Sequence, residues 1–125
     1  MSNEYLNWIK QAEADLKTSE NSLNSKDFYA SVFWSQQAVE KYLKSKILKE
    51  KDELIKTHDL VLLGKRSNAP EDIMLTLKKL SLNYVESRYG ILVDKIPAEV
   101  FGKKEAIESL KSAKEIEIWI KTQKL

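Results

Sequence analysis

The sequence predicts an all-α fold, with five helical segments in a single domain spanning residues 1–125. Three observations lead to this prediction. Apolar residues recur at spacings of three and four along five stretches, which is the period of an amphipathic helix. No stretch shows the alternation and the partner that a β-strand needs. Only three glycines and two prolines interrupt the chain, and 42% of its residues are hydrophobic, enough for a sizeable core.

The first predicted helix covers about residues 3–23. Ser2 directly precedes it and is expected to cap its first turn, because a serine hydroxyl can accept a hydrogen bond from a free backbone N–H there. The apolar stripe of this helix comprises Tyr5, Trp8, Ile9, Ala12, Leu16 and Leu23.

The second predicted helix begins after Asp27, a good N-cap residue, and continues to about residue 49. Gln36 and Glu40 fall in the middle of its apolar stripe, where polar groups are not expected. Burying such groups without partners costs roughly 1–3 kcal/mol each, and more for a charge. The pair therefore forms either a buried structural network or the floor of a binding site. The apolar residues on the same side are Tyr29, Val32, Val39, Leu43 and Ile47.

The opposite side of this helix is apolar as well. A helix that is apolar on two sides lies at the centre of a bundle or at a subunit interface, and we expect a homodimer. The apolar residues concerned are Trp34, Ala38, Tyr42 and Leu48. A run of lysines follows Glu40, and such a run near a helix C-terminus usually marks a solvated face. The alternative is that Gln37, Lys41 and Lys44 form the polar edge of a groove beside Glu40.

The rest of the chain is predicted to form three more helices. Thr57 is expected to cap a helix over residues 58–65. A fourth helix opens at residues 68–72, where Pro70 suits a first turn, and ends at Gly90. A packed loop over residues 91–101 leads to a fifth helix over residues 103–121. The inward residues of the last two helices are Ile73, Leu77, Leu80, Tyr84, Ala106, Leu110, Ala113 and Ile120.

Composition excludes several kinds of site. The chain has no cysteine, so disulfides and thiolate chemistry are absent, and its one histidine, His58, has no partner spacing typical of a metal site. No glycine-rich phosphate loop occurs, and no Ser-His-acid triad can be singled out. We therefore expect no metal, no cofactor and no assigned catalytic residue. His58 itself is interpreted first as a first-turn helix residue, and alternatively as a possible ligand contact.

The net charge and the hydropathy of the chain argue against nucleic acid and membranes as its partners. Lys and Arg total 21 against 19 Asp and Glu, and a net charge of +2 does not indicate a nucleic-acid-binding protein. No signal-peptide core or membrane-length apolar run is present, so we expect a cytoplasmic protein without membrane contact. Arg88 is one of only two arginines, and it lies between Tyr84 and Tyr89. It is either a surface residue near a helix end or part of a clamp for phosphate.

The order of several segments resembles the HEPN family, the higher eukaryote and prokaryote nucleotide-binding domains. The most specific segments are QQAVEKYLK at residues 36–44, THDL at residues 57–60, and Tyr84 followed by Arg88 and Tyr89. The resemblance covers nearly the whole chain. It implies an up-and-down bundle of four or five helices, a homodimer, and, for small prokaryotic members, a minimal nucleotidyltransferase as the partner protein.

Some members of the family are toxins that cleave RNA through an Arg-x4–6-His motif, and here the sequence departs from them. The positions at which histidine would follow Arg88 are Val93, Asp94 and Lys95. General acid–base cleavage needs a group that titrates near neutrality, so the activity is not carried over. A ribonuclease toxin of a toxin–antitoxin pair and a pure protein-interaction module remain the alternatives.

The leading hypothesis is a non-catalytic protein that binds a nucleotide, a nucleotidyltransferase partner, or both. Arg88 and Lys44 are expected to contact phosphate and Tyr89 to stack on a base. Gln36 and Glu40 are expected to form hydrogen bonds with a base or sugar.

Overall fold

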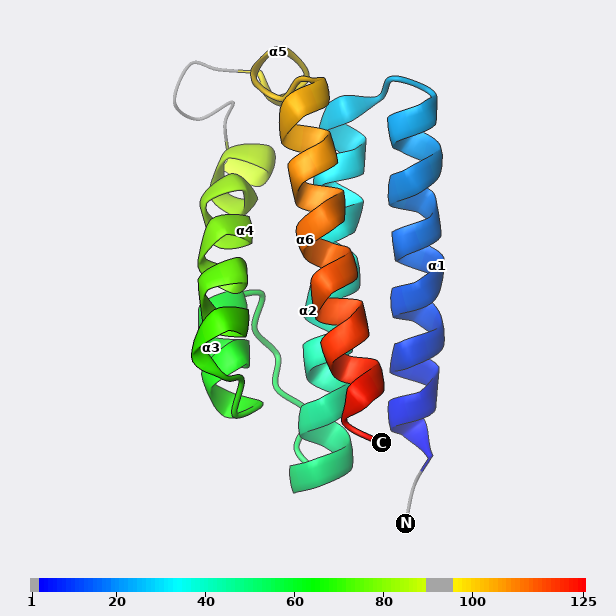
Figure 1. Cartoon of the computed structure of the whole chain (residues 1–125), viewed down its shortest axis with the longest axis vertical. Helices are drawn as coiled ribbons and strands as arrows, with labels where there is room; N and C mark the ends of the chain where they lie inside the picture. The colour runs from blue at the N-terminus through cyan, green and yellow to red at the C-terminus, as the bar shows by residue number, and fades with distance from the viewer. Residues whose placement is uncertain (1–2, 90–95) are drawn as a thin grey trace.

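In the computed structural model the described residues are 3–89 and 96–125, with side chains described except at 83–89 and 97. These residues form six helices: α1 (Glu4–Asn24), α2 (Phe28–Lys51), α3 (Leu60–Arg66), α4 (Glu71–Tyr89), α5 (Pro97–Val100) and α6 (Lys103–Thr122). The four long helices lie side by side and alternate in direction, while α3 packs along part of α4 and α5 lies at one end (Figure 1). The predicted up-and-down helical bundle is confirmed.

Helix α2 is the central element of the bundle. Val39 and Leu43 from the predicted inward stripe are fully buried, and so are Ala38 and Tyr42 from the opposite side. An apolar residue on the back of α2 thus packs inside the subunit, so Tyr42 is not evidence for a subunit interface. The inward placement predicted for Tyr29 is wrong, since this residue is 46% exposed. Phe28 packs against the end of the core in its place.

The start of α3 differs from the prediction. Asp59, not Thr57, is the N-cap residue, and its carboxylate accepts hydrogen bonds from the backbone N–H of Val61 at 3.0 Å and Leu62 at 3.1 Å. Thr57 instead accepts a hydrogen bond from the N–H of Asp59. Aspartate satisfies two free donors at once, which explains why the helix begins two residues later than predicted. His58 consequently lies in the extended segment before α3.

The other helix starts follow the prediction more closely. Asn3 and Asp27 occupy the N-cap positions of α1 and α2 without a side-chain capping bond, and Ser2 lies outside the described residues. Between α4 and α6, the predicted packed loop contains the short helix α5, and residues 90–95 lie outside the described part. Within the described residues, no helix is both long and apolar enough to cross a membrane.

The inward faces of α4 and α6 are as predicted, with Tyr84 outside the described side chains. Their buried residues are Ile73, Leu77, Leu80, Ala106, Leu110, Ala113 and Ile120. Gly64 allows α3 to approach α4 closely, because a Cβ at this position would lie 2.5 Å from Leu77 Cδ1 and 2.7 Å from Met74 Sδ. This close contact holds α3 against α4.

Candidate functional site

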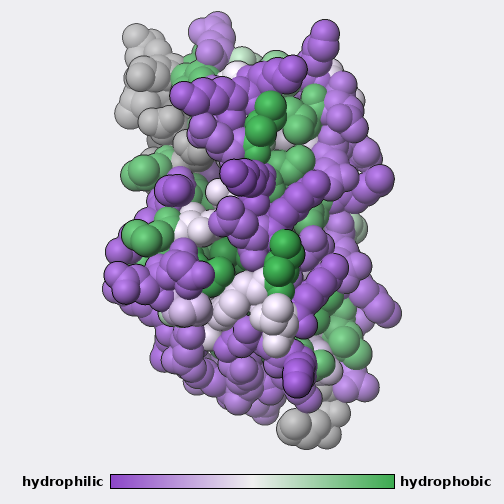
Figure 2. Space-filling model, in the orientation of Figure 1, coloured by the Kyte–Doolittle hydropathy of each residue, from purple (hydrophilic) through white to green (hydrophobic). Residues whose placement is uncertain are grey.

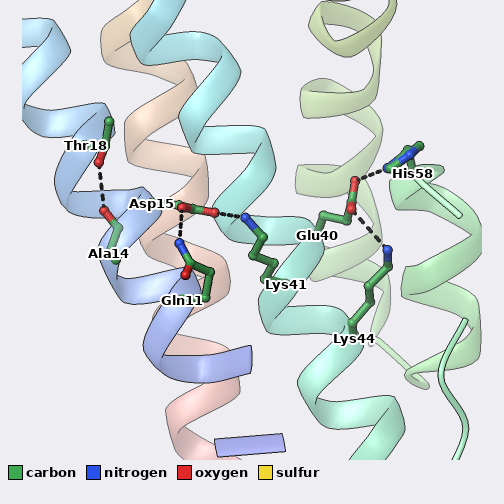
Figure 3. A network of polar contacts seen from close by, with 8 residues as sticks. All are labelled: Gln11, Ala14, Asp15, Thr18, Glu40, Lys41, Lys44 and His58. Carbon is green, nitrogen blue, oxygen red and sulfur yellow. Dashed lines mark hydrogen bonds and ion pairs between the residues drawn. The ribbon is translucent and has the colours of Figure 1, made fainter. Parts of the chain in front are cut away.

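Glu40 is the centre of a cluster of three charged or titratable side chains, which we call the Glu40 cluster: Glu40, Lys44 and His58. Lys44 Nζ lies 3.1 Å from Glu40 Oε2, and His58 Nδ1 lies 3.0 Å from Glu40 Oε1 (Figure 3). The Glu40 side chain is 5% exposed and that of Lys44 is 8% exposed, whereas that of His58 is 61% exposed. The carboxylate is therefore satisfied within one subunit, and the cluster reaches solvent through the imidazole.

The lysines of α2 are not the solvated face that their spacing predicted. Lys44 and Lys46 are both buried. Lys44 lies 5.8 Å from the centre of the Trp8 ring, and Lys46 bonds to Glu50 and to the carbonyl of Ser67. A buried ammonium group needs such partners, because an unpaired charge in the interior is very costly. The prediction was wrong because helical spacing does not reveal what a neighbouring helix places over a given face.

Gln36 has a different environment from Glu40. It is 1% exposed, and its Nε2 donates a hydrogen bond of 3.0 Å to the carbonyl oxygen of Leu80. This bond joins α2 to α4 in the interior of the bundle. A ligand cannot touch Gln36 without separating these two helices, so the structure supports a packing role for this residue.

The fold brings only some of the predicted site residues close together. Arg88 and Tyr89 belong to the last turn of α4, and their side chains lie outside the described residues. Arg88 is eight residues beyond Leu80, about 12 Å along the helix axis at 1.5 Å per residue. Glu40 lies one turn from Gln36 in the opposite direction, because α2 and α4 are antiparallel (Figure 1). The backbone thus separates the Arg88 end of α4 from the Glu40 cluster.

A second buried carboxylate, which the sequence analysis missed, lies between α1 and α2. Asp15 is paired with Lys41 and accepts a hydrogen bond of 2.9 Å from Gln11 Nε2 (Figure 3). One turn further along α1, the hydroxyl of Ser19 forms hydrogen bonds with those of Ser31 and Ser35 on α2, and all three serines are buried. The signal was present in the sequence, since Asp15 and Ser19 flank Leu16 on the stripe of the first helix.

Tyr42 supplies one more buried polar contact of α2. Its hydroxyl donates a hydrogen bond of 2.8 Å to Glu117 Oε2 on α6. Burial raises the pKa of Tyr42 above its usual value of 10.0, and the hydrogen bond to Glu117 is the next largest cause. Tyr42 thus acts as a neutral donor that joins α2 to α6. Among the described residues, no group of three His, Cys, Asp or Glu side chains is placed to hold a metal ion.

The Glu40 cluster combines groups suited to polar ligands. An ammonium group attracts phosphate, a carboxylate accepts hydrogen bonds from hydroxyl or amino groups, and an imidazole can do either. The ion pair is buried, and the exposed imidazole lies between it and solvent. A small polar ligand would therefore reach Glu40 once the imidazole turns away from the carboxylate, and it would then lie beside the imidazole.

Comparisons with known proteins agree on one family. The family model of the HEPN domain matches residues 5–123. The chain is similar to the crystal structure of TT1696 from Thermus thermophilus, with a TM-score of 0.86 and 27% identity over 97% of this chain and 98% of that one.

A second solved structure, of ST0689, is described as an archaeal HEPN homologue. Its TM-score is 0.81 and its identity 30%, with 98% of each chain covered. No curated protein gave a match. The helical bundle, the family model and these two structures lead to the same conclusion: the chain belongs to the HEPN family.

Proposed function

We propose that this chain is a non-catalytic HEPN protein of the cytoplasm, which binds a nucleotide at the Glu40 cluster and acts as a homodimer beside a nucleotidyltransferase partner. The observation that carries the nucleotide proposal is a buried lysine–carboxylate pair that meets solvent through an exposed histidine. Polar groups of this kind are expensive to bury, so their presence at an accessible edge favours a binding role over a purely structural one.

Each member of the cluster has a proposed role. Lys44 attracts the phosphate groups, and His58 contacts the ligand at the surface. Glu40 accepts hydrogen bonds from ribose hydroxyl groups or a base amino group once His58 has moved away. The phosphate contact of Arg88 and the stacking role of Tyr89 remain a separate proposal from the sequence, because the far end of α4 is too distant from Lys44 to hold the same phosphate groups. Gln36 is assigned to packing because of its bond to Leu80.

The proposed lack of catalysis rests on the sequence. Neither Arg88 nor Arg66 is followed by histidine at the spacing that the ribonuclease motif requires. His58 precedes both arginines in the chain, so it cannot be the histidine of that motif. A family member without the motif is better suited to recognition than to cleavage.

Isothermal titration calorimetry with ATP, GTP and their monophosphates at millimolar concentration tests nucleotide binding. We expect binding heat with the wild type and at least tenfold weaker binding for His58→Ala, whereas weaker binding for Arg88→Ala alone would place the nucleotide at the far end of α4. Arg66→Ala is the matched control, because Arg66 is an exposed arginine at the end of α3 whose described ion pair to Glu53 is long, at 3.8 Å. Absence of heat with all four nucleotides would overturn the nucleotide proposal.

Two further measurements separate the alternatives. Labelled RNA incubated with the purified protein should remain intact, and cleavage abolished by His58→Ala would instead identify a ribonuclease. Co-purification from the native cells should recover a nucleotidyltransferase. Recovery of that partner without any nucleotide binding would favour a pure interaction module.

A further inference from the structure

Lys44 has a second contact, in addition to Glu40, with an aromatic ring of α1. Its ammonium nitrogen lies 5.8 Å from the centre of the Trp8 ring. The buried ion pair of Lys44 and Glu40 is thus flanked by two ring systems, the indole of Trp8 and the imidazole of His58. One ring comes from α1 and the other from the segment before α3, so the Glu40 cluster lies between these two parts of the chain.

The Glu40 cluster lies on the side of α2 that faces away from α6. Tyr42 bonds to Glu117 of α6, and Glu40 and Lys44 are each two residues from Tyr42. Two residues correspond to a rotation of about 200° around an α-helix, which places them on opposite sides. Helix α6 lies in front of α2 on the face of the molecule shown in Figure 2, where apolar side chains are scattered among hydrophilic ones. A ligand therefore approaches the Glu40 cluster from the other face.

The apolar core does not account for Trp8 as it does for Trp119. Both tryptophans are partly buried, and each contacts a buried lysine, Trp8 at 5.8 Å from Lys44 and Trp119 at 5.4 Å from Lys46. Trp119 also packs against the main apolar core, whereas among the described residues Trp8 is not part of that packing. The indole of Trp8 therefore has a place in the structure that core packing alone does not explain.

Trp8 lies at the border between the buried and the exposed side of α1. Of its neighbours one turn away, Tyr5 and Ala12 are buried, and Glu4 and Gln11 are exposed. Residues three and four positions apart lie side by side on a helix, so one flank of the indole meets the buried stripe and the other meets solvent. A flat ligand can reach the ring from that exposed flank.

The contact between Lys44 and the indole is weak enough to be exchanged. A cation–π interaction extends to about 6 Å from the ring centre, and 5.8 Å is close to this limit. Glu40, at 3.1 Å, already neutralises the charge of Lys44. Nucleobases stack favourably on aromatic side chains whatever their sequence. A base can therefore take the place of the ammonium group over the indole, and the ammonium group can then turn to the phosphate groups.

We infer that the aromatic base of the bound nucleotide stacks on Trp8, beside the ion pair of Lys44 and Glu40. The inference rests on nucleotide binding at the Glu40 cluster in the proposed function, and it adds the position of the base. Trp8, and not Tyr89 at the far end of α4, is then the stacking residue of this site. A ligand with a phosphate group but without a base would leave the indole uncovered.

Tryptophan fluorescence tests the stacking directly. The chain has three tryptophans, so Trp34→Phe combined with Trp119→Phe leaves Trp8 as the only one. AMP should quench its emission with the same midpoint that calorimetry gives for this variant, because a stacked base quenches an indole. Ribose 5-phosphate, which has no base, should not quench it. The matched control is Trp8→Phe combined with Trp119→Phe, in which the remaining Trp34 should show no quenching by AMP.

Single substitutions separate stacking from a structural role. Trp8→Leu should weaken AMP binding at least tenfold in calorimetry, and Trp8→Phe, which keeps an aromatic face, should recover most of the loss. Trp34→Leu is the control, because Trp34 is also a partly buried tryptophan, but its ring packs against Phe33, with ring centres 5.2 Å apart. This variant should bind AMP as the wild type does. Circular dichroism melting should show that all variants fold.

The outcomes distinguish this inference from the proposed function. Binding heat with AMP but no quenching of Trp8, or equal quenching of Trp34 in the control, would keep the nucleotide site and overturn stacking on Trp8. Unchanged AMP affinity in Trp8→Leu would do the same. Weaker binding by Trp8→Leu without quenching of Trp8 would make the indole a support for Lys44 and also overturn the inference. Absence of heat with every nucleotide would overturn both proposals.

Discussion

Two buried carboxylates of this bundle look alike but are held in different ways. Asp15 and Glu40 are 4% and 5% exposed at their side chains, and each is paired with a lysine of α2. The second partner of Asp15 is Gln11, one turn away on the same helix. The second partner of Glu40 is His58, which comes from the separate segment before α3. The tertiary partner of Asp15 is therefore Lys41 on the long helix α2, whereas that of Glu40 is His58 on the short segment before α3.

This difference has a consequence for function. The Asp15 network lies between α1 and α2, so it opens only when those two helices separate. The Glu40 cluster can open when the segment before α3 moves, while α2 keeps its place in the core. The partner lysines differ too, because the side chain of Lys44 is 8% exposed and that of Lys41 is 18% exposed. We therefore expect the Glu40 cluster to be both the more costly network to damage and the more accessible to a ligand.

The largest expected effect is that of Glu40→Gln. This change leaves the ammonium group of Lys44 buried without its counter-charge, which should lower the free energy of unfolding by about 3–5 kcal/mol. Urea unfolding followed by circular dichroism measures the loss. Adding Lys44→Met should recover much of it, since the double change removes both charges. A single variant as stable as the wild type would contradict the claim that this pair is buried and strongly coupled.

Asp15→Asn should have a smaller effect, of about 1–3 kcal/mol. Lys41 is more exposed than Lys44, so its ammonium group can turn to water when the carboxylate charge is removed. Gln11 can still donate to the asparagine oxygen. The same unfolding experiment makes the comparison directly. A loss equal to that of Glu40→Gln would show that the two networks do not differ as their burial suggests.

Tyr42→Phe tests a third buried contact and should cost about 1 kcal/mol at neutral pH, the usual value of one hydrogen bond. Because the pKa of Tyr42 is raised in the fold, the unfolded chain loses this proton first as the pH rises past about 10. The unfolded state then binds fewer protons than the folded state, so stability falls with increasing pH. Urea unfolding at pH 8 to 11 should show a smaller alkaline decline for Tyr42→Phe than for the wild type.

Helical periodicity predicted the bundle well because it reports which face of each helix is buried. It placed Val39, Leu77 and Ala113 correctly in the core. It failed where the outcome depends on a competition between neighbours, as at the start of α3, where Asp59 caps the helix in place of Thr57. Such competition is decided by which side chain satisfies more free backbone donors, and both residues are acceptable N-caps by type.

The site was harder to predict than the fold. The sequence identified Gln36 and Glu40 as polar groups on an apolar face, and both are buried. It did not reveal that Gln36 bonds to a backbone carbonyl while Glu40 bonds to two side chains, because those partners include groups from α4 and from the segment before α3. Periodicity within one helix contains no information about contacts between elements that are distant in the chain.

The smallest expected effect on stability, and the most informative about function, is that of His58→Ala. The imidazole is 61% exposed, so the loss in free energy of unfolding should stay below about 1 kcal/mol. The same change removes the one exposed member of the Glu40 cluster. Urea unfolding and calorimetry with ATP on the same protein therefore separate the two roles.

A variant that keeps its stability but binds nucleotide at least tenfold more weakly would identify His58 as a ligand contact. His58→Gln provides a control, because a glutamine can still donate a hydrogen bond to Glu40. If His58→Gln restores stability without restoring affinity, the imidazole itself contacts the ligand. Nucleotide affinity unchanged in both variants would place the ligand elsewhere and leave the Glu40 cluster as a structural network, like that of Asp15.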